Sequence, residues 1–326
     1  MSKNTIKSYQ YAFQLLFEFM HDKMGLSPEK VSFENLGGDT VLSYLSWLED
    51  ERKCSATTRN LRKTAISSFA KYAMKKNLGE AIAFYTEVSD IPRKRTQTEP
   101  DIKYFTKEEV SILLDAPNTS TKIGRRNAVL MSVLYASGAR AQELCDITLN
   151  DVYFGSETNI RLIGKGNKPR LVTIPSNCAS LLKKYLTNIG LDAANPNHQR
   201  RHIFSSQTND KMSPSCVGEI VKKYVGIVKA SHPHLFWRNK YSPHSFRHSI
   251  AVHMLECGES LAVIKAFLGH ASITSTTIYA NVTPELANRY LRERGKAIPE
   301  INVQQRGSFT SLPFLNRAVK RPSSDS

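Results

Sequence analysis

The sequence predicts a mainly α-helical protein with a small β-sheet, divided into two domains. Apolar residues recur at helical spacing over most of the 326 residues. One pair of short β-rich segments, at residues 159–163 and 170–174, interrupts this pattern. The chain is too long for one average domain, and a charged stretch with two prolines near residue 95 separates its two parts.

The first part, residues 1–92, is predicted to be a helical bundle. Its first helix runs from residue 4 to about residue 24, with an apolar stripe at Tyr9, Phe13, Leu16, Phe17 and Met20. A second helix follows Gly37-Gly38, where Asp39 or Thr40 is available as the N-cap. Its stripe consists of Val41, Tyr44, Leu45 and Leu48.

A third helix of this part is expected to open at Ser55. Its inward face would carry Leu61, Ala65, Phe69 and Tyr72. The basic residues of the segment would then lie on the surface, namely Arg59, Arg62, Lys63 and Lys71. The first domain is therefore expected to have a basic exterior.

Residues 93–103 are predicted to be the linker between the domains. This stretch is charged and poor in large apolar residues, and it begins with Arg93-Lys94-Arg95. Such a basic run suits contact with a polyanion backbone, and it is equally typical of a solvated linker.

Residues 104–298 form the second predicted domain. It opens with a capping-box pattern, Thr106 followed by Glu109. The segment from Ala128 to Tyr135 is apolar on nearly every side, which predicts a buried central helix. The two β-rich segments follow, joined by a turn of small and basic residues at 164–169.

The rest of this domain is predicted to be helical. Several helix starts are marked by a capping residue followed by proline, at Ser213-Pro214, Ser242-Pro243 and Thr283-Pro284. Residues 299–326 lack periodicity and are expected to form a C-terminal tail.

The formal charge of +16 restricts the kind of partner. The 45 lysines and arginines are spread along the chain, which favours an extended polyanion. The five cysteines are scattered without a C-x-x-C pair, so neither a disulfide framework nor a cysteine zinc site is expected. Without a signal-peptide-like start or an apolar run of about 18 residues, the chain is expected to be cytoplasmic and not bound to a membrane.

Four short segments carry residues suited to chemistry. In the first, Arg140 directly follows the buried central helix, where a charge requires a partner. Glu143 lies one helical turn later and could orient it. In isolation, a simple ion pair between Arg140 and Glu143 explains this segment equally well.

The second segment is the turn Gly164-Lys165-Gly166 between the strands. The flanking glycines let a backbone approach a ligand closely while Lys165 projects from the tip. Lys168 competes for the same role, and a lysine on such a turn is most often only a solvated charge.

The third segment opens a helix at Pro243. His244 and Arg247 are spaced i and i+3, so they share one face near a helix N-terminus that favours an anion. Zinc is a rival interpretation, because His244 and His248 are spaced i and i+4. No glutamate stands between them and no third ligand is evident, so no metal is predicted.

The fourth segment ends in Tyr279. An amphipathic helix formed by Leu261, Ile264, Phe267 and Leu268 leads to His270, and Tyr279 follows nine residues later. Taken alone, the segment around Tyr279 is equally typical of a core helix with a half-buried tyrosine.

Taken in order, six residues of these segments resemble the catalytic signature of the tyrosine recombinase (phage integrase) family: Arg140, Lys165, His244, Arg247, His270 and Tyr279. The resemblance extends over nearly the whole second domain, and the first resembles the family's SAM-like core-binding domain. It implies that the two domains together form a C-shaped clamp. Xer-type recombinases and integrases of mobile elements are closest in layout.

The resemblance also implies a role for each residue. Arg140 and Arg247, assisted by His270, would clamp the scissile phosphate through their guanidinium groups. Tyr279 would be the nucleophile, with His244 as the first choice to accept its proton.

Three further roles follow from the same resemblance. Lys165 would protonate the leaving 5′-oxygen, while Glu143 and His248 would support the pocket. Basic residues elsewhere are candidate DNA contacts, namely Arg59, Arg62, Lys63, Arg93, Lys94, Arg95, Lys168 and Arg170.

The implied reaction forms a 3′-phosphotyrosyl bond and needs no metal, ATP or other cofactor. Four protomers, of this chain alone or with a paralogue, would hold two duplexes with specific sites and exchange strands through a Holliday junction. Integration, excision, transposition and dimer resolution are all compatible with this scheme.

Two other functions fit the same pocket. A catalytically inactive architectural DNA-binding protein would share the fold, although the presence of all six pocket residues argues against it. A type IB topoisomerase or telomere resolvase would share the pocket as well, and a topoisomerase would relax supercoiled DNA that lacks any specific site.

Overall fold

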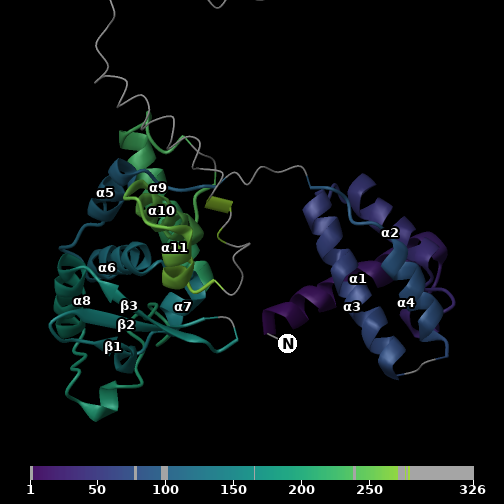
Figure 1. The fold of residues 1–326 in the computed structure, drawn as a ribbon, viewed down its shortest axis with the longest axis horizontal. Coiled ribbons are helices and arrows are strands. Elements are labelled where there is room, and N and C mark those ends of the chain that lie inside the picture. The colour runs from purple at the N-terminus through teal and green to yellow at the C-terminus, as the bar shows by residue number, and fades with distance from the viewer. Residues whose placement is uncertain are drawn as a thin grey trace, which may run out of the picture. The chain divides into compact units, whose positions relative to one another are not determined.

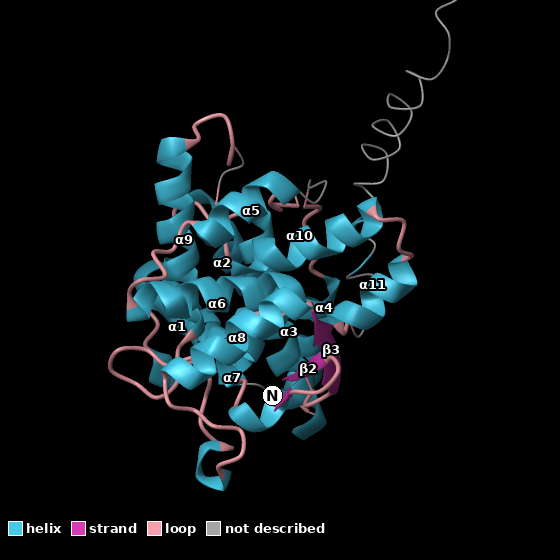
Figure 2. Ribbon diagram, turned by 90° about the vertical axis from the view of Figure 1, so that its left-hand side faces the viewer, coloured by secondary structure: helices cyan, strands magenta, loops and turns pink. Residues whose placement is uncertain are grey.

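The computed structural model describes residues 3–76, 79–96, 102–164, 166–237, 240–270, 276, 278 and 279. The chain divides into two compact units, residues 1–99 and 100–326 (Figure 1). Helices make up most of both units, and a small sheet lies in the second (Figure 2). The predicted mainly α fold with a small β-sheet is confirmed.

The first unit is a helical bundle around an apolar core. Its helices are α1 (Lys3–Met24), α2 (Gly38–Asp50), α3 (Ala56–Lys76) and α4 (Ala81–Asp90), with a 3-10 turn at Pro28–Lys30. The predicted stripe of α2 is confirmed, because all four of its side chains are fully buried: Val41, Tyr44, Leu45 and Leu48. Leu16 and Met20 of α1 lie in the same core.

The start of α2 differs from the prediction. Its N-cap is Gly37, not Asp39 or Thr40, because helical backbone already begins at Gly38. The Gly38 N–H donates to the Glu87 carboxylate at 2.6 Å, so a side chain from α4 replaces the expected local cap. The sequence did not predict α4 as a separate helix.

The buried face of α3 also differs from the prediction. Leu61 and Tyr72, expected inside, are 49% and 59% exposed, whereas Arg59 and Lys63, expected on the surface, are buried. The buried residues of α3 are Arg59, Lys63, Ala65, Ile66, Ala70 and Ala73. Of the predicted stripe, Ala65 is therefore confirmed, and Phe69 is half-buried against the core. Basic side chains can line a core with their methylene stems, so the apolar pattern alone placed Leu61 and Tyr72 on the wrong face.

The segment after α4 packs along α3. Asn60 Nδ2 donates to the Lys94 carbonyl at 2.8 Å, and the Lys94 N–H donates to Asn60 Oδ1 at 3.1 Å. Arg93 donates to Thr64 Oγ1 at 2.8 Å. Residues 93 and 94 of the predicted linker are therefore held on the first unit.

The described part of the second unit runs from helix to sheet and back to helix. Its elements are α5 (Lys107–Asp115), α6 (Lys122–Ser137), α7 (Ala141–Asp146), β1 (Val152–Tyr153), β2 (Thr158–Ile163), β3 (Pro169–Ile174), α8 (Ser176–Asn188), α9 (Pro214–Ser231), α10 (Pro243–Glu256) and α11 (Leu261–Leu268). Short 3-10 turns lie at Leu149–Asp151 and Pro196–His198. The antiparallel sheet has the order β1-β2-β3, and β1 was not predicted.

Local capping signals predicted several of these helix starts. The capping box of Thr106 and Glu109 is present, and Ser213 and Ser242 are the N-caps of α9 and α10. The predicted start at Thr283-Pro284 and the tail at 299–326 lie outside the described residues.

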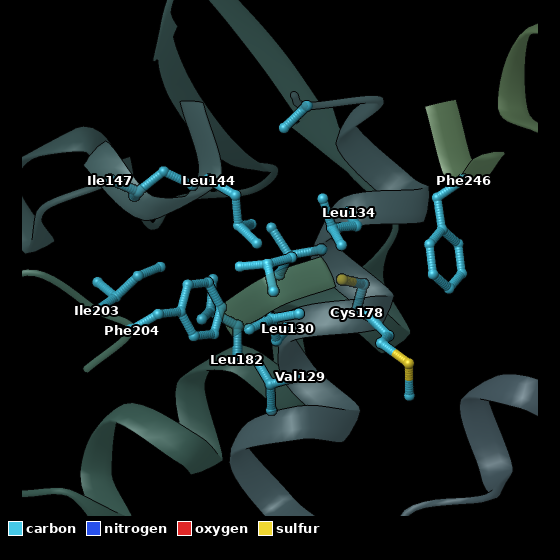
Figure 3. Close-up of a cluster of buried hydrophobic side chains, with 14 of the residues drawn as sticks. Val129, Leu130, Leu134, Leu144, Ile147, Cys178, Leu182, Ile203, Phe204 and Phe246 are labelled. Carbon is cyan, nitrogen blue, oxygen red and sulfur yellow. The ribbon is translucent and has the colours of Figure 1, made fainter. Parts of the chain in front are cut away.

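α6 is the central helix of this unit, as predicted. Val129, Leu130 and Leu134 are at most 1% exposed, and buried side chains of α7, α8 and neighbouring segments gather around them (Figure 3). α6 ends at Ser137 and α7 begins at Ala141, so the buried helix fixes the short connection that carries Arg140. A second apolar cluster joins α10, α11 and Tyr279.

Candidate active site

Arg247, near the start of α10, is fully buried. Its terminal nitrogens donate to the backbone carbonyls of Gly138 at 2.6 Å and Leu268 at 2.7 Å. One carbonyl lies two residues before Arg140 and the other two residues before His270. One guanidinium therefore brings together the ends of α6 and α11 and the polar residues that follow each.

Both of these helix ends require a glycine. Gly138 (φ +57°) and Gly269 (φ +64°) adopt the left-handed backbone that glycine tolerates best. A Cβ at Gly138 would lie 3.0 Å from side-chain atoms of Leu268 and Phe267, and one at Gly269 would lie 2.9 Å from Cδ of Arg170. A larger residue at either position would displace groups that build the pocket.

Arg140 is paired with a buried carboxylate. Its guanidinium donates to Glu143 Oε1 at 2.6 Å, and Arg170 of β3 donates to Glu143 Oε2 at 2.8 Å. Burial alone would raise the pKa of Glu143, but hydrogen bonds from Arg170 and Arg140 outweigh it and lower this pKa, so the carboxylate is ionised. The predicted partner of Arg140 is thus in place, and Arg170, predicted as a DNA contact, is a second partner of Glu143.

Tyr279 meets His248 at this pocket, and His248 in turn contacts His244. Its hydroxyl lies 2.8 Å from His248 Nδ1, and the rings of His248 and His244 are 4.6 Å apart. Desolvation raises the pKa of Tyr279 to about 12, although Arg247 and Arg140 oppose it. Burial, followed by His244 and Arg247, lowers the pKa of His248 to about 3. At neutral pH both groups are therefore neutral, and the hydroxyl donates to Nδ1 in the tautomer that carries its proton on Nε2.

This arrangement differs in one respect from the sequence-based expectation, which placed His244 at the tyrosine. Tyr279 is 1% exposed, as a core tyrosine would be. Tyr279 is nevertheless hydrogen-bonded to His248, which directly follows Arg247 on α10, and Arg247 and Arg140 oppose the rise of its pKa. Desolvation, with Arg247 and Arg140, also lowers the pKa of His244, which keeps an exposed surface.

His270 is the remaining predicted catalytic residue that the structure describes. Its Nδ1 lies 2.9 Å from the hydroxyl oxygen of Thr276, which is fully buried. Desolvation, followed by Arg247 and Arg140, lowers the pKa of His270 to about 4. No role was predicted for Thr276, and its only signal was its place just before Tyr279.

The pocket has an excess of positive charge. Arg140 and Arg170 both pair with Glu143, while desolvation and then Arg140 lower the pKa of Arg247 to about 9. The buried Nε atoms of Arg247 and Arg170 have no hydrogen-bond partner within the described parts of the chain. Neighbouring guanidinium donors of this kind suit an anion with several acceptor oxygens, such as a phosphoryl group.

The other predicted site residues have different surroundings. Lys165 lies outside the described residues, and Lys168 and Arg95 are exposed. Five predicted DNA contacts are buried in the first unit or bonded to it, namely Arg59, Arg62, Lys63, Arg93 and Lys94. Arg59, for example, pairs with Glu49 at 3.2 Å and so contributes to the fold of that unit.

The described residues carry neither a metal cluster nor a membrane-spanning helix. No group of three or more His, Cys, Asp or Glu side chains among the described residues could hold a metal ion. None of the described helices combines the length and apolarity needed to span a bilayer. The five cysteines are free thiols.

Two protein-family models match the chain. The phage integrase family model matches residues 103–285, and the phage integrase N-terminal SAM-like domain model matches residues 1–80. The integrase/recombinase y4rC of Sinorhizobium fredii is 32% identical over 283 residues, covering 86% of this chain and 82% of that protein. Tyrosine recombinase XerD of Halalkalibacterium halodurans is 30% identical, with 87% and 88% covered.

A solved structure shares the fold. The XerH site-specific recombinase, in a post-cleavage complex with a palindromic difH substrate, matches with a TM-score of 0.69 at 19% identity, covering 89% of this chain and 79% of that one. At this identity the likeness concerns the fold alone. Since the integrase model spans more than half of the chain and its curated relatives match over most of their length, the chain belongs to the phage integrase family of tyrosine recombinases.

Proposed function

We propose that this chain is a site-specific recombinase that cuts and rejoins DNA through a covalent bond between Tyr279 and a backbone phosphate. The observation that carries the proposal is the hydrogen bond of the Tyr279 hydroxyl to His248, within the electrostatic reach of Arg247 and Arg140. Ordinary core packing would not require a buried tyrosine hydroxyl beside guanidinium groups.

In this proposal Arg140 and Arg247 hold the scissile phosphate. With a pKa of about 9, Arg247 is charged at neutral pH despite its burial. The two guanidinium groups stabilise the negative charge of the non-bridging oxygens in the pentacoordinate transition state. Glu143 and Arg170 act indirectly, because they hold Arg140 in position.

The Tyr279 oxygen bonds to phosphorus as the bond from phosphorus to the 5′-oxygen breaks. The phenolic proton passes to His248 Nδ1, and the bound phosphate anion favours this transfer because it raises the low pKa of His248. Lys165 protonates the leaving 5′-oxygen, as the family resemblance implies. Since Tyr279 is 1% exposed, the groups that cover the phenol must move aside when DNA binds, while its hydrogen bond to His248 is kept.

The phosphotyrosyl bond retains the energy of the broken phosphodiester, so a 5′-hydroxyl from another strand can reverse the step without ATP. We propose double-stranded DNA with specific recombination sites as the partner, and the cytoplasm as the place of action. The assembly is a tetramer of this chain, or of this chain and a paralogue, that exchanges strands through a Holliday junction. The XerH structures, solved with difH substrate before and after cleavage, are consistent with such chemistry on this fold.

Covalent trapping tests the proposal. The protein is incubated in EDTA with a nicked duplex that carries a candidate site, and adducts are resolved on a denaturing gel. The expected adduct forms with the wild type and with Tyr135→Phe, a matched variant of a tyrosine that is bonded to His253 in α10 at 2.8 Å. It is absent with Tyr279→Phe, and persistence there would remove Tyr279 from its role.

A second assay separates recombination from topoisomerase activity. Supercoiled DNA without any candidate site should stay supercoiled in the presence of the protein. Relaxation of this DNA would indicate a type IB topoisomerase instead.

A further inference from the structure

The imidazole ring of His270 is bonded to a residue that lies just before Tyr279. Its Nδ1 is 2.9 Å from the hydroxyl oxygen of Thr276. Thr276 is fully buried, whereas His270 keeps some exposed surface. Thr276 follows His270 by six residues and precedes Tyr279 by three. This hydrogen bond therefore joins one predicted catalytic side chain to the segment that carries the proposed nucleophile.

The backbone of His270 is fixed by other contacts. The His270 N–H donates to the Lys265 carbonyl at 3.1 Å. Arg247 donates to the Leu268 carbonyl at 2.7 Å, and Gly269 ends α11 with a φ of +64°. These contacts place the Cα of His270 but do not restrict the rotation of its ring. The bond to Thr276 restricts that rotation.

The ring is neutral before a ligand binds. Desolvation, followed by Arg247 and Arg140, lowers the pKa of His270 to about 4. A neutral imidazole has one donor nitrogen and one acceptor nitrogen. Because Nδ1 faces Thr276, Nε2 is the ring nitrogen left for a ligand. The tautomer therefore decides whether Nε2 donates to a phosphoryl oxygen or presents a lone pair that repels it.

The Thr276 hydroxyl can select the tautomer. A buried hydroxyl requires an acceptor for its proton, and Nδ1 is an acceptor when the ring carries its proton on Nε2. In the opposite tautomer, Nδ1–H would donate to the hydroxyl and Nε2 would have no proton for the phosphate. One hydrogen bond can thus satisfy the buried hydroxyl and prepare the ring for an anion.

We propose that Thr276 is a positioning residue for His270. Its hydroxyl donates to Nδ1 and holds the ring in the tautomer whose Nε2–H donates to a non-bridging oxygen of the scissile phosphate. Thr276 itself does not touch the phosphate. The proposal rests on the proposed function, and it adds a residue that the six-residue catalytic signature does not contain.

Nuclear magnetic resonance of the free, full-length protein tests the tautomer directly. The nine histidines are labelled with ¹⁵N, and two-bond ¹H–¹⁵N correlations at neutral pH show which ring nitrogen carries the proton. The spectrum of His270→Gln identifies the His270 signals. The proton is expected on Nε2 in the wild type and in Thr276→Ser, and on both nitrogens in exchange in Thr276→Val. A proton on Nδ1 in the wild type would overturn the inference, even if Thr276→Val does not fold.

Single-turnover formation of the Tyr279 adduct tests the consequence for the reaction. Thr276→Val is expected to slow it by about 10-fold or more with unchanged duplex affinity, because a transition-state hydrogen bond is weakened. Thr276→Ser, which keeps the hydroxyl, is expected to restore most of the rate. Thr158→Val is the matched control, since it makes the same substitution at a buried threonine of β2 and is expected to react as the wild type does.

A double-mutant cycle separates positioning from a general structural role. If Thr276 acts through His270, Thr276→Val is expected to cause no further loss of rate in the His270→Gln background. Equal losses in the two backgrounds would contradict the inference.

The outcomes also separate this inference from the proposed function. If the wild type forms the Tyr279 adduct and Thr276→Val forms it at the same rate, the inference is wrong and the recombinase proposal stands. If the wild type forms no adduct, the recombinase proposal fails and the inference fails with it, whichever tautomer the spectra show.

Discussion

Two buried arginines, one in each unit, differ in what neutralises them. Arg59, 4% exposed, lies 3.2 Å from the Glu49 carboxylate and donates to the Pro92 carbonyl at 3.4 Å. Arg247, fully buried, donates to two carbonyls, and no described carboxylate lies within ion-pair distance of it. Burial of a cation is therefore no sign of function, whereas burial without a counter-ion is, because an anionic ligand can supply the missing charge.

The surroundings of each arginine serve different purposes. Glu49 binds both Arg59 and Lys94, which ties the segment after α4 to the first unit. Arg247 instead bonds the ends of α6 and α11, and Arg140 and His270 each follow one of these ends by two residues. The first arrangement stabilises a fold, and the second prepares a binding site.

Replacing the two arginines has the largest expected effect. Arg247→Ala is expected to slow single-turnover cleavage by about 1000-fold or more with little change in duplex affinity, because its phosphate contact forms mainly in the transition state. Arg59→Ala should leave cleavage by the folded protein unchanged and lower the free energy of unfolding by about 1–3 kcal/mol, since Glu49 loses a partner. Cleavage rates, duplex titrations and urea unfolding measure these quantities. Equal losses of binding and cleavage in Arg247→Ala would remove the contrast.

The two histidines near the tyrosine give an intermediate effect. His248→Ala is expected to slow cleavage by about 100-fold, a typical loss for a general base, because the Tyr279 hydroxyl loses its acceptor. His244→Ala should cost less, since its ring contacts His248 and not the hydroxyl. Single-turnover rates for the two variants decide the assignment. A larger loss with His244→Ala would assign the role of proton acceptor to His244 instead.

Acid stability is the smallest expected effect. Burial holds the pKa values of His248 and His270 at about 3 and about 4, below the ordinary histidine value of about 6.5. The unfolded chain binds these protons first, so the free energy of unfolding falls as the pH drops through about 6.5 and levels off below the folded values. Urea unfolding between pH 7.5 and 5 should show a smaller decrease in His248→Asn than in the wild type. An identical pH dependence in the two proteins would contradict the depressed pKa of His248.

Where local signals decide the structure, the sequence predicted it correctly. The capping box at Thr106 predicts a helix start, and the uniformly apolar segment from Ala128 to Tyr135 predicts a buried helix. The orientation of α3 and the cap of α2 depend on distant partners instead. Lys63 is buried although it is cationic, and Glu87 caps a helix 49 residues away in sequence. Residue types along the chain do not contain such information.

The candidate site divides in the same way. The family resemblance named the residues of the site, and in the structure Arg140 and Arg247 act on the pKa values of His244, His270 and Tyr279. The family resemblance did not show which imidazole faces the phenol, because His244 and His248 lie one turn apart on α10. The resemblance also did not show that Arg170 turns inward. This position is open only because Gly269 has no side chain.

Mapping the site of covalent attachment tests the central claim most directly. The wild-type protein is trapped on a nicked duplex, digested with nuclease and protease, and the nucleotide-bearing peptide is identified by mass spectrometry. Of the 13 tyrosines in the chain, only Tyr279 is expected to carry the 3′-phosphate. A nucleotide on another tyrosine would contradict the account.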